Sequence, residues 1–294
     1  MPASRIYFII SCARSGSTSL AKILDTATNG SCLVEPLPNF NRESRDFMEG
    51  RLRNPREVLV RDVLPRISMV LDEGRIYGEK NVTFGPFIPA FHEMLRCKFV
   101  FLTRDGRDVA TSLMNWHNEA FGTIYRECND AGSLSKLALR VKAALPLEED
   151  SSDYARPRPG PDDPFYREWA NLSRFEMVTW YWSHSNCLYA ENLRGIPSEQ
   201  WRQIDYTNVT ADEIEELFDF LGLKGFNRAV TEKLLQQRIN SLWERFHMRT
   251  RFPSWRDWSP EMFRQFKRIA APTMQSLGYD AEGQRFEESR KKAV

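Results

Sequence analysis

Short hydrophobic runs along the chain alternate with stretches in which apolar residues recur at helical spacing. The runs are rich in β-branched and aromatic residues, which is typical of buried strands. They are RIYFII (5–10), SCLVEP (31–36), RIYGEK (75–80), KFVFLT (98–103) and WRQIDY (201–206). Pro36 is expected to end the second strand just after Glu35.

Helical spacing follows several of these runs. Leu20, Ile23, Leu24 and Ala27 predict a helix after the first strand, with Asn29-Gly30 as its end. The remaining predicted helices are FGPFIPAFHEML (84–95, a turn into a helix), a helix from Gly106 with Val109, Ala110 and Leu113 on one face, a long aromatic helix over about 165–193, a helix capped by Thr210, and a last helix ending at Gly278.

Strands that alternate with helices indicate an α/β fold. We expect a P-loop-like central parallel β-sheet with helices on both faces. The chain is interpreted as a single domain over 1–294, with an irregular insertion at 117–165 and a charged, frayed tail at 281–294. Ligands of such folds bind at the carboxyl ends of the strands, so the loops that follow the strands carry the candidate chemistry.

Composition narrows the classes of function. The 294 residues hold 41 Lys and Arg against 40 Asp and Glu, so a protein that binds nucleic acid with its whole surface is disfavoured. The five cysteines (12, 32, 97, 128 and 187) contain no C-x-x-C and are expected to be reduced, mostly in the core. No apolar run approaches the roughly 18 residues of a membrane span. If Met1 is the natural start, we expect a soluble cytoplasmic protein.

The first strand is followed by SCARSGSTSL, Ser11 to Leu20, which resembles a phosphate-binding loop without its usual lysine. In the register G-x-x-x-x-G-K-[ST], Gly16 is the second glycine, Ser17 stands at the lysine and Thr18 at the hydroxyl. Arg14 supplies a forked cation instead. The candidate anion-binding residues are Arg14, Ser15, Gly16, Ser17, Thr18 and Ser19. The alternative is an ordinary strand-to-helix turn with a serine cap.

The fourth strand is followed by a second polar loop, RDGRDVATS, 104–112. Arg104 at the strand end and Ser112 two turns into the helix are expected to face one phosphate. Arg107 and Asp108 are expected on a solvated face. Asp105 follows the strand as a Walker-B aspartate would, but it stands behind Arg104, and this disfavours an ATP·Mg²⁺ enzyme. By itself the segment also fits a surface turn.

Together the two loops resemble those of sulfotransferases that use 3′-phosphoadenosine 5′-phosphosulfate (PAPS). RSGST and RDGR…S are the corresponding motifs, and LVEP, YGEKNVTF, IDYTNVTADEIEELFDFLGL and WRDWSPEMFRQFKRIAAPTMQSLGYD follow in the family's order. LVEP is most similar to the carbohydrate and tyrosylprotein branches. Thr207-Asn208 and the missing proline after Lys80 depart from the family pattern.

The resemblance implies roles for individual residues. The first loop holds the 5′-phosphosulfate, Arg104 and Ser112 hold the 3′-phosphate, and Tyr206 lies near the adenine. Arg249 and Arg251 belong to a basic loop over the nucleotide. The resemblance also implies a reaction that needs no metal, with 3′-phosphoadenosine 5′-phosphate (PAP) as product.

A carboxylate at a strand end is expected to take the proton of the acceptor hydroxyl. Glu35 is the first candidate and Glu79 the second, while His117 is a weaker third. Arg14 and Lys80 are assigned to the leaving oxygens.

The expected acceptor is a sugar hydroxyl first and a phenol second. A small-molecule or lipid alcohol, a degenerate P-loop kinase and an inactive nucleotide-binding scaffold stay open as alternatives, and the oligomeric state is undetermined.

Overall fold

Five parallel strands form the centre of the protein. In the computed structural model, which describes residues 4–116, 124–125, 127–130, 156–237 and 252–280, they make one sheet with the order β2-β3-β1-β4-β5. The strands are β1 (Ile6–Ile10), β2 (Gly30–Val34), β3 (Ile76–Lys80), β4 (Lys98–Thr103) and β5 (Trp201–Asp205). This confirms the predicted α/β fold with a central parallel sheet.

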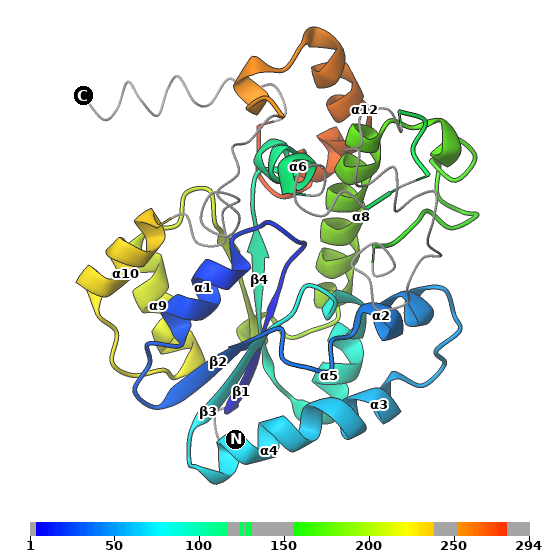
Figure 1. Ribbon diagram of the computed structural model, residues 1–294. Coiled ribbons are helices and arrows are strands. Elements are labelled where there is room, and N and C mark those ends of the chain that lie inside the picture. The colour runs from blue at the N-terminus through cyan, green and yellow to red at the C-terminus, as the bar shows by residue number, and fades with distance from the viewer. Residues whose placement is uncertain (1–3, 117–123, 126, 131–155, 238–251, 281–294) are drawn as a thin grey trace.

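Helices pack on both faces of the sheet because side chains of successive strand residues point to opposite sides. Tyr7 and Ile9 of β1 pack with helices on one face, and Phe8 and Ile10 pack on the other. The first face carries α1 (Ser17–Leu24), α9 (Ala211–Leu221) and α10 (Arg228–Gln236) (Figure 1). The second carries α2 (Asn41–Met48), α3 (Pro55–Val58), a π-helical turn (Leu59–Val63), α4 (Leu64–Asp72), α5 (Ile88–Leu95) and part of α8 (Arg174–Arg194).

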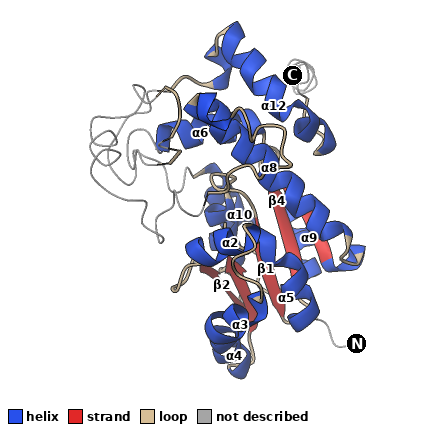
Figure 2. Cartoon of the chain, turned by 90° about the vertical axis from the view of Figure 1, so that its right-hand side faces the viewer, coloured by secondary structure: helices blue, strands red, loops and turns tan. Residues whose placement is uncertain are grey.

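A third apolar cluster lies beyond the carboxyl end of β4, where α6 (Gly106–Asn115), α8 and α12 (Pro260–Ser276) pack together (Figures 1 and 2). Trp180, Tyr181 and Trp182 of α8 are at most 3% exposed, so these aromatic side chains of the long helix belong to the core. Single 3₁₀ turns are formed by Gly85–Phe87, Trp169–Asn171, Ser198–Gln200 and Trp255–Asp257.

Two predicted helix boundaries are wrong. The long aromatic helix begins at Arg174 rather than near 165, because Ser173 and Glu176 form a capping box there. The first helix ends at Leu24, well before Gly30, and Gly30 instead pairs with Ile76 at the start of β2. The predicted cap at Thr210 is confirmed, since its side chain accepts from the N–H of Glu213.

The cysteine prediction is confirmed in most respects. All five are free, and Cys12, Cys32, Cys97 and Cys128 are buried, whereas Cys187 is exposed. In the part of the chain that the structure describes, no helix is both long and apolar enough to cross a membrane.

The strand order reverses around β1, which has β3 on one side and β4 on the other. Chain connections therefore leave β1 and β4 in opposite directions along the sheet, and in open α/β sheets ligands bind at the carboxyl ends of the strands at such a point. Residues 11–16 and 104–105 follow these two strands directly. The fold thus brings the two polar loops together.

A buried ion pair supports the second loop. Asp105 caps α6 by accepting from the N–H of Arg107, and its carboxylate lies 2.6 Å from the Arg107 guanidinium. Arg107 is 2% exposed and lies over the ring of Trp255, so the prediction of a solvated face is wrong for this residue. The sequence does not predict the pair, because an arginine two residues after an aspartate is equally common in an exposed turn.

We predict that Asp105→Ala lowers the free energy of unfolding by at least about 3 kcal/mol, because it leaves a buried guanidinium without its anion. Urea unfolding followed by tryptophan fluorescence measures the change. Asp212→Ala, which breaks an exposed pair with Arg228, should leave the midpoint nearly unchanged. Equal small losses in the two variants would contradict the prediction.

Candidate functional site

The first polar loop turns sharply into α1. Arg14 and Gly16 have positive φ values of 68° and 92°, and Gly16 is the N-cap residue of the helix. Ser19 and Leu20 donate the first backbone hydrogen bonds, both to the carbonyl of Gly16. The N–H groups ahead of Ser19 at this helix end have no partner within the helix, and such an end attracts an anion.

The serines of this loop lie mainly inside the protein. Ser15 is fully buried, and its hydroxyl is 2.9 Å from the sulfur of Cys12. Ser17 and Ser19 are also buried, whereas Thr18 is half-buried. The side chains of the three serines therefore pack the loop, and its backbone and Arg14 are the groups placed to meet a ligand.

Arg14 joins the two loops. Its Nε donates to the hydroxyl of Ser112 at 3.0 Å, and its guanidinium lies 4.2 Å from the ring centroid of Trp116. Arg104 in turn donates to the backbone carbonyl of Arg14 at 3.2 Å and lies 3.7 Å from Asp108. Two arginines and a serine hydroxyl that are far apart in sequence thus meet beside the N-terminus of α1.

Tyr206 covers the loop from the end of β5. Its backbone N–H bonds the carbonyl of Thr103, and a Cβ added to Gly16 would lie 2.3 Å from its ring. The neighbouring Thr207 accepts from the N–H of Asp105. The segment that follows β5 is therefore held against both loops.

Glu35 and Lys80 form an ion pair at the ends of β2 and β3. The distance from Lys80 Nζ to Glu35 Oε1 is 2.5 Å, and the Glu35 side chain is 43% exposed, whereas that of Lys80 is 5% exposed. Burial alone would raise the pKa of Glu35, but Lys80 holds it below its usual value. Burial lowers the pKa of Lys80, and the Glu35 carboxylate opposes that shift.

Glu79 lies in the interior on the opposite face of β3. It is fully buried and accepts two hydrogen bonds of 2.9 Å from Arg66, and Tyr77 also donates to it. Burial raises its pKa in spite of these partners. Its salt bridge is to Arg66, so Glu79 points away from the Glu35–Lys80 pair at the strand ends.

Arg156 is a residue that the sequence did not reveal. It comes from the proline-rich stretch ARPRPGPDDP and is 7% exposed. Its Nη1 donates to the hydroxyl of Tyr181 at 3.0 Å, and that hydroxyl also accepts from the N–H of Ala13 in the first loop. An arginine in an irregular segment carries no pattern that would mark it. Trp116, at the C-cap of α6, was also not predicted as a site residue.

Arg249, Arg251 and His117 lie outside the described residues. Among the residues described, no group of three or more His, Cys, Asp or Glu side chains is arranged to hold a metal ion.

The chain was compared with known proteins. No protein-family model matches it, and no curated protein matches it. Matching solved structures include a sulfotransferase from Alicyclobacillus acidocaldarius (14% identity, 95% of this chain and 98% of that chain, TM-score 0.47). A second is the sulfotransferase domain of the Synechococcus PCC 7002 olefin synthase (14% identity, 94% of this chain and 94% of that chain, TM-score 0.49). A third is mouse sulfotransferase SULT7A1 complexed with PAP (12% identity, 92% of this chain and 84% of that chain, TM-score 0.45).

All three structures are named as sulfotransferases, the class that the sequence motifs resemble. The identities are below 25% and the TM-scores below 0.5, so no activity is inferred from these likenesses. The finer resemblance to the carbohydrate and tyrosylprotein branches stays a prediction.

The geometry of Gly16 generates a stability prediction. Gly16→Ala should lower the free energy of unfolding by about 1–3 kcal/mol, because the methyl group meets Tyr206 and the positive φ is strained. Thermal unfolding of Gly16→Ala, Tyr206→Ala and the double variant separates these causes. The ring contact predicts that the double variant is more stable than the sum of the two single effects.

Gly195→Ala is the matched control for this series. Gly195 has φ −80° and no atom within 4 Å of an added Cβ, so its substitution should not destabilise. Similar losses at Gly16 and Gly195 would show that the close approach of Tyr206 has no energetic weight.

Proposed function

We propose that this protein transfers a sulfuryl group from PAPS to an acceptor hydroxyl. The observation that carries the proposal is the meeting of Arg14, Arg104 and Ser112 beside the N-terminus of α1, with the Glu35–Lys80 pair at the neighbouring strand ends. A donor with anionic groups at two ends fits this arrangement, because one end faces the helix terminus and the other faces the second loop.

The residues divide between the two ends of the donor. The backbone of residues 14–18 and the Arg14 side chain bind the 5′-phosphosulfate, as a helix N-terminus binds an anion. Arg104 and Ser112 bind the 3′-phosphate, since a guanidinium and a hydroxyl are strong donors to phosphate oxygens. Tyr206, which covers Gly16, lies beside the adenine. Arg249 and Arg251 stay proposed as further contacts to the nucleotide.

Sulfuryl transfer then needs a base and a stabilised leaving group. The acceptor oxygen forms a bond to sulfur while the bond between sulfur and the phosphate oxygen breaks, and PAP leaves with the negative charge. Glu35 takes the acceptor proton, because it is exposed enough to meet an acceptor and its lowered pKa keeps it ionised. Lys80 and Arg14 stabilise the charge on the leaving oxygens. Glu79 is a weaker candidate for the base, since Arg66 and Tyr77 occupy its oxygens.

A degenerate P-loop kinase is less well supported. Its magnesium would need a free aspartate after a strand, and Asp105 is instead committed to the cap of α6 and to Arg107. An inactive scaffold would not need a solvent-accessible carboxylate paired with a buried lysine at the strand ends. The acceptor is proposed to be a sugar hydroxyl or a phenol.

We predict that Arg104→Ala weakens PAP binding about 10–100-fold, because a charged hydrogen bond to the 3′-phosphate is lost. ATP, which has no 3′-phosphate, should lose less than about threefold. Isothermal titration calorimetry measures both affinities, and Arg228→Ala, a change at an exposed surface pair, serves as control. Equal losses for PAP and ATP would contradict the assignment of Arg104.

We also predict that Glu35→Gln binds PAP normally and transfers sulfate about 10²–10⁴-fold more slowly, because it removes the base. A base acts only when deprotonated, and Lys80 lowers the pKa of Glu35, so the wild-type rate should decline only below about pH 4.5. Single-turnover transfer from ³⁵S-labelled PAPS at several pH values tests this. Unchanged transfer by Glu35→Gln would rule Glu35 out as base, and normal PAP binding without transfer by the wild-type protein would support the scaffold.

A further inference from the structure

A pocket lies beside the Glu35–Lys80 pair, since Val82, whose backbone bonds the Glu35 carboxylate, is one of its lining residues. Its walls come from α2, the segment after β3, α8 and Arg156-Pro157. Met48, Val82 and Leu188 supply apolar surface, and Ser44 and Ser185 supply hydroxyls. Among the described residues that line it, none is an aspartate or a glutamate, and Arg156 is the one arginine or lysine.

The buried guanidinium of Arg156 has no carboxylate partner among the described residues. Its one hydrogen bond there runs from Nη1 to the hydroxyl of Tyr181, and Nε is buried without a partner. Burial raises the pKa of Tyr181, so this partner is a neutral phenol. A buried charge is costly unless an anion and hydrogen bonds compensate it, which indicates that the anion comes from a ligand.

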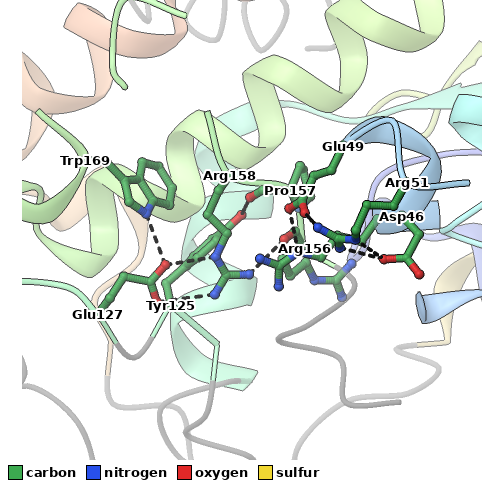
Figure 3. Close-up of polar contacts among 10 residues, drawn as sticks. Asp46, Glu49, Arg51, Tyr125, Glu127, Arg156, Pro157, Arg158 and Trp169 are labelled. Atoms are coloured by element: carbon green, nitrogen blue, oxygen red, sulfur yellow. Dashed lines mark hydrogen bonds and ion pairs between the residues drawn. The ribbon is translucent and has the colours of Figure 1, made fainter. Parts of the chain in front are cut away.

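Nearby arginines are compensated within the protein, in contrast to Arg156. Arg158 is paired with Glu127 at 2.9 Å, and Arg51 is paired with Asp46 at 2.6 Å (Figure 3). The half-buried Arg66 and the buried Arg107 also have carboxylate partners. Arg156 lies among these neutralised pairs without a described carboxylate in contact with it, and Glu35 acts on its charge without forming an ion pair.

Arg156 lies close enough to the reacting groups to position an acceptor. Its charge helps to lower the pKa of Glu35, and a hydrogen bond from the Val82 backbone acts on the same carboxylate. Val82 also lines the pocket, which therefore borders the proposed base. An acceptor at the mouth of the pocket can present its hydroxyl to Glu35 while a small anionic group enters the pocket and meets Arg156.

We propose that Arg156 binds a carboxylate of the acceptor, so that the substrate is a hydroxy acid with an apolar or sugar body. A carboxylate meets one edge of a guanidinium with two parallel hydrogen bonds, and Tyr181, by taking Nη1, leaves the Nε–Nη2 edge without an acceptor. Nε is buried, so the carboxylate meets Nη2 first and reaches Nε once the side chain turns toward the pocket. This inference rests on the proposed sulfuryl transfer and adds the class of its acceptor.

Binding of two acid and ester pairs tests the inference: 4-hydroxyphenylacetate and glucuronate, each with its methyl ester. Calorimetric titrations use the full chain with and without PAP, and ³⁵S transfer is followed in parallel. The wild-type protein should bind at least one acid about 10–100-fold more tightly than its ester. Arg156→Gln should lose this preference, and Arg156→Lys, which keeps the charge without the fork, should retain part of it.

Arg51→Gln is the matched control, since it removes an equal charge from the end of α2 and should keep the preference for the acid. PAP affinity should be unchanged in every variant. The inference is overturned if neither acid is preferred over its ester, or if Arg156→Gln weakens PAP binding as strongly as acid binding, which would place Arg156 at the donor. A preference for the acid without any PAP binding would overturn the proposed sulfuryl transfer but would still support a carboxylate-binding site at Arg156.

Discussion

The parallel pairing of β1 with β4 determines where the charged groups of the candidate site lie. Phe8 pairs with Phe99 and Ile10 with Phe101, so the two strands end side by side. The loops that follow must then share one crevice, and the contacts of Arg14 with Ser112 and Arg104 are the result. The pairing of β2 with β3 places Glu35 beside Lys80 in the same way.

Much of this arrangement was predictable from the sequence. The five strands are strong hydrophobic runs, and a parallel sheet carries its loops to one edge, so the meeting of residues 14 and 104 follows from periodicity and topology. The cap at Thr210 was predictable for a local reason, because the hydroxyl and Glu213 lie within one helical turn. The roles assigned to the site residues stay predictions.

The contacts that sequence reasoning missed depend on tertiary partners. Glu79 and Lys80 are neighbours in the chain, but alternation along β3 sends one to Arg66 and the other to Glu35. In the sequence Arg107 resembles a surface residue, and only the folded structure shows that it is buried in an ion pair with Asp105. Arg156 lies in an irregular segment, and only its burial against α8 distinguishes it from the exposed arginines of the chain.

The Glu35–Lys80 ion pair determines when in the proposed reaction Lys80 carries an uncompensated positive charge. Before the reaction the carboxylate compensates the ammonium, so the pair is neutral as a whole. When Glu35 accepts a proton from the acceptor, this compensation ends and Lys80 becomes a net positive charge in a largely buried position. That moment coincides with the growth of negative charge on the departing phosphate oxygen. Within the proposed reaction, proton uptake by one member of the pair therefore makes the other a stronger electrostatic partner for the leaving group.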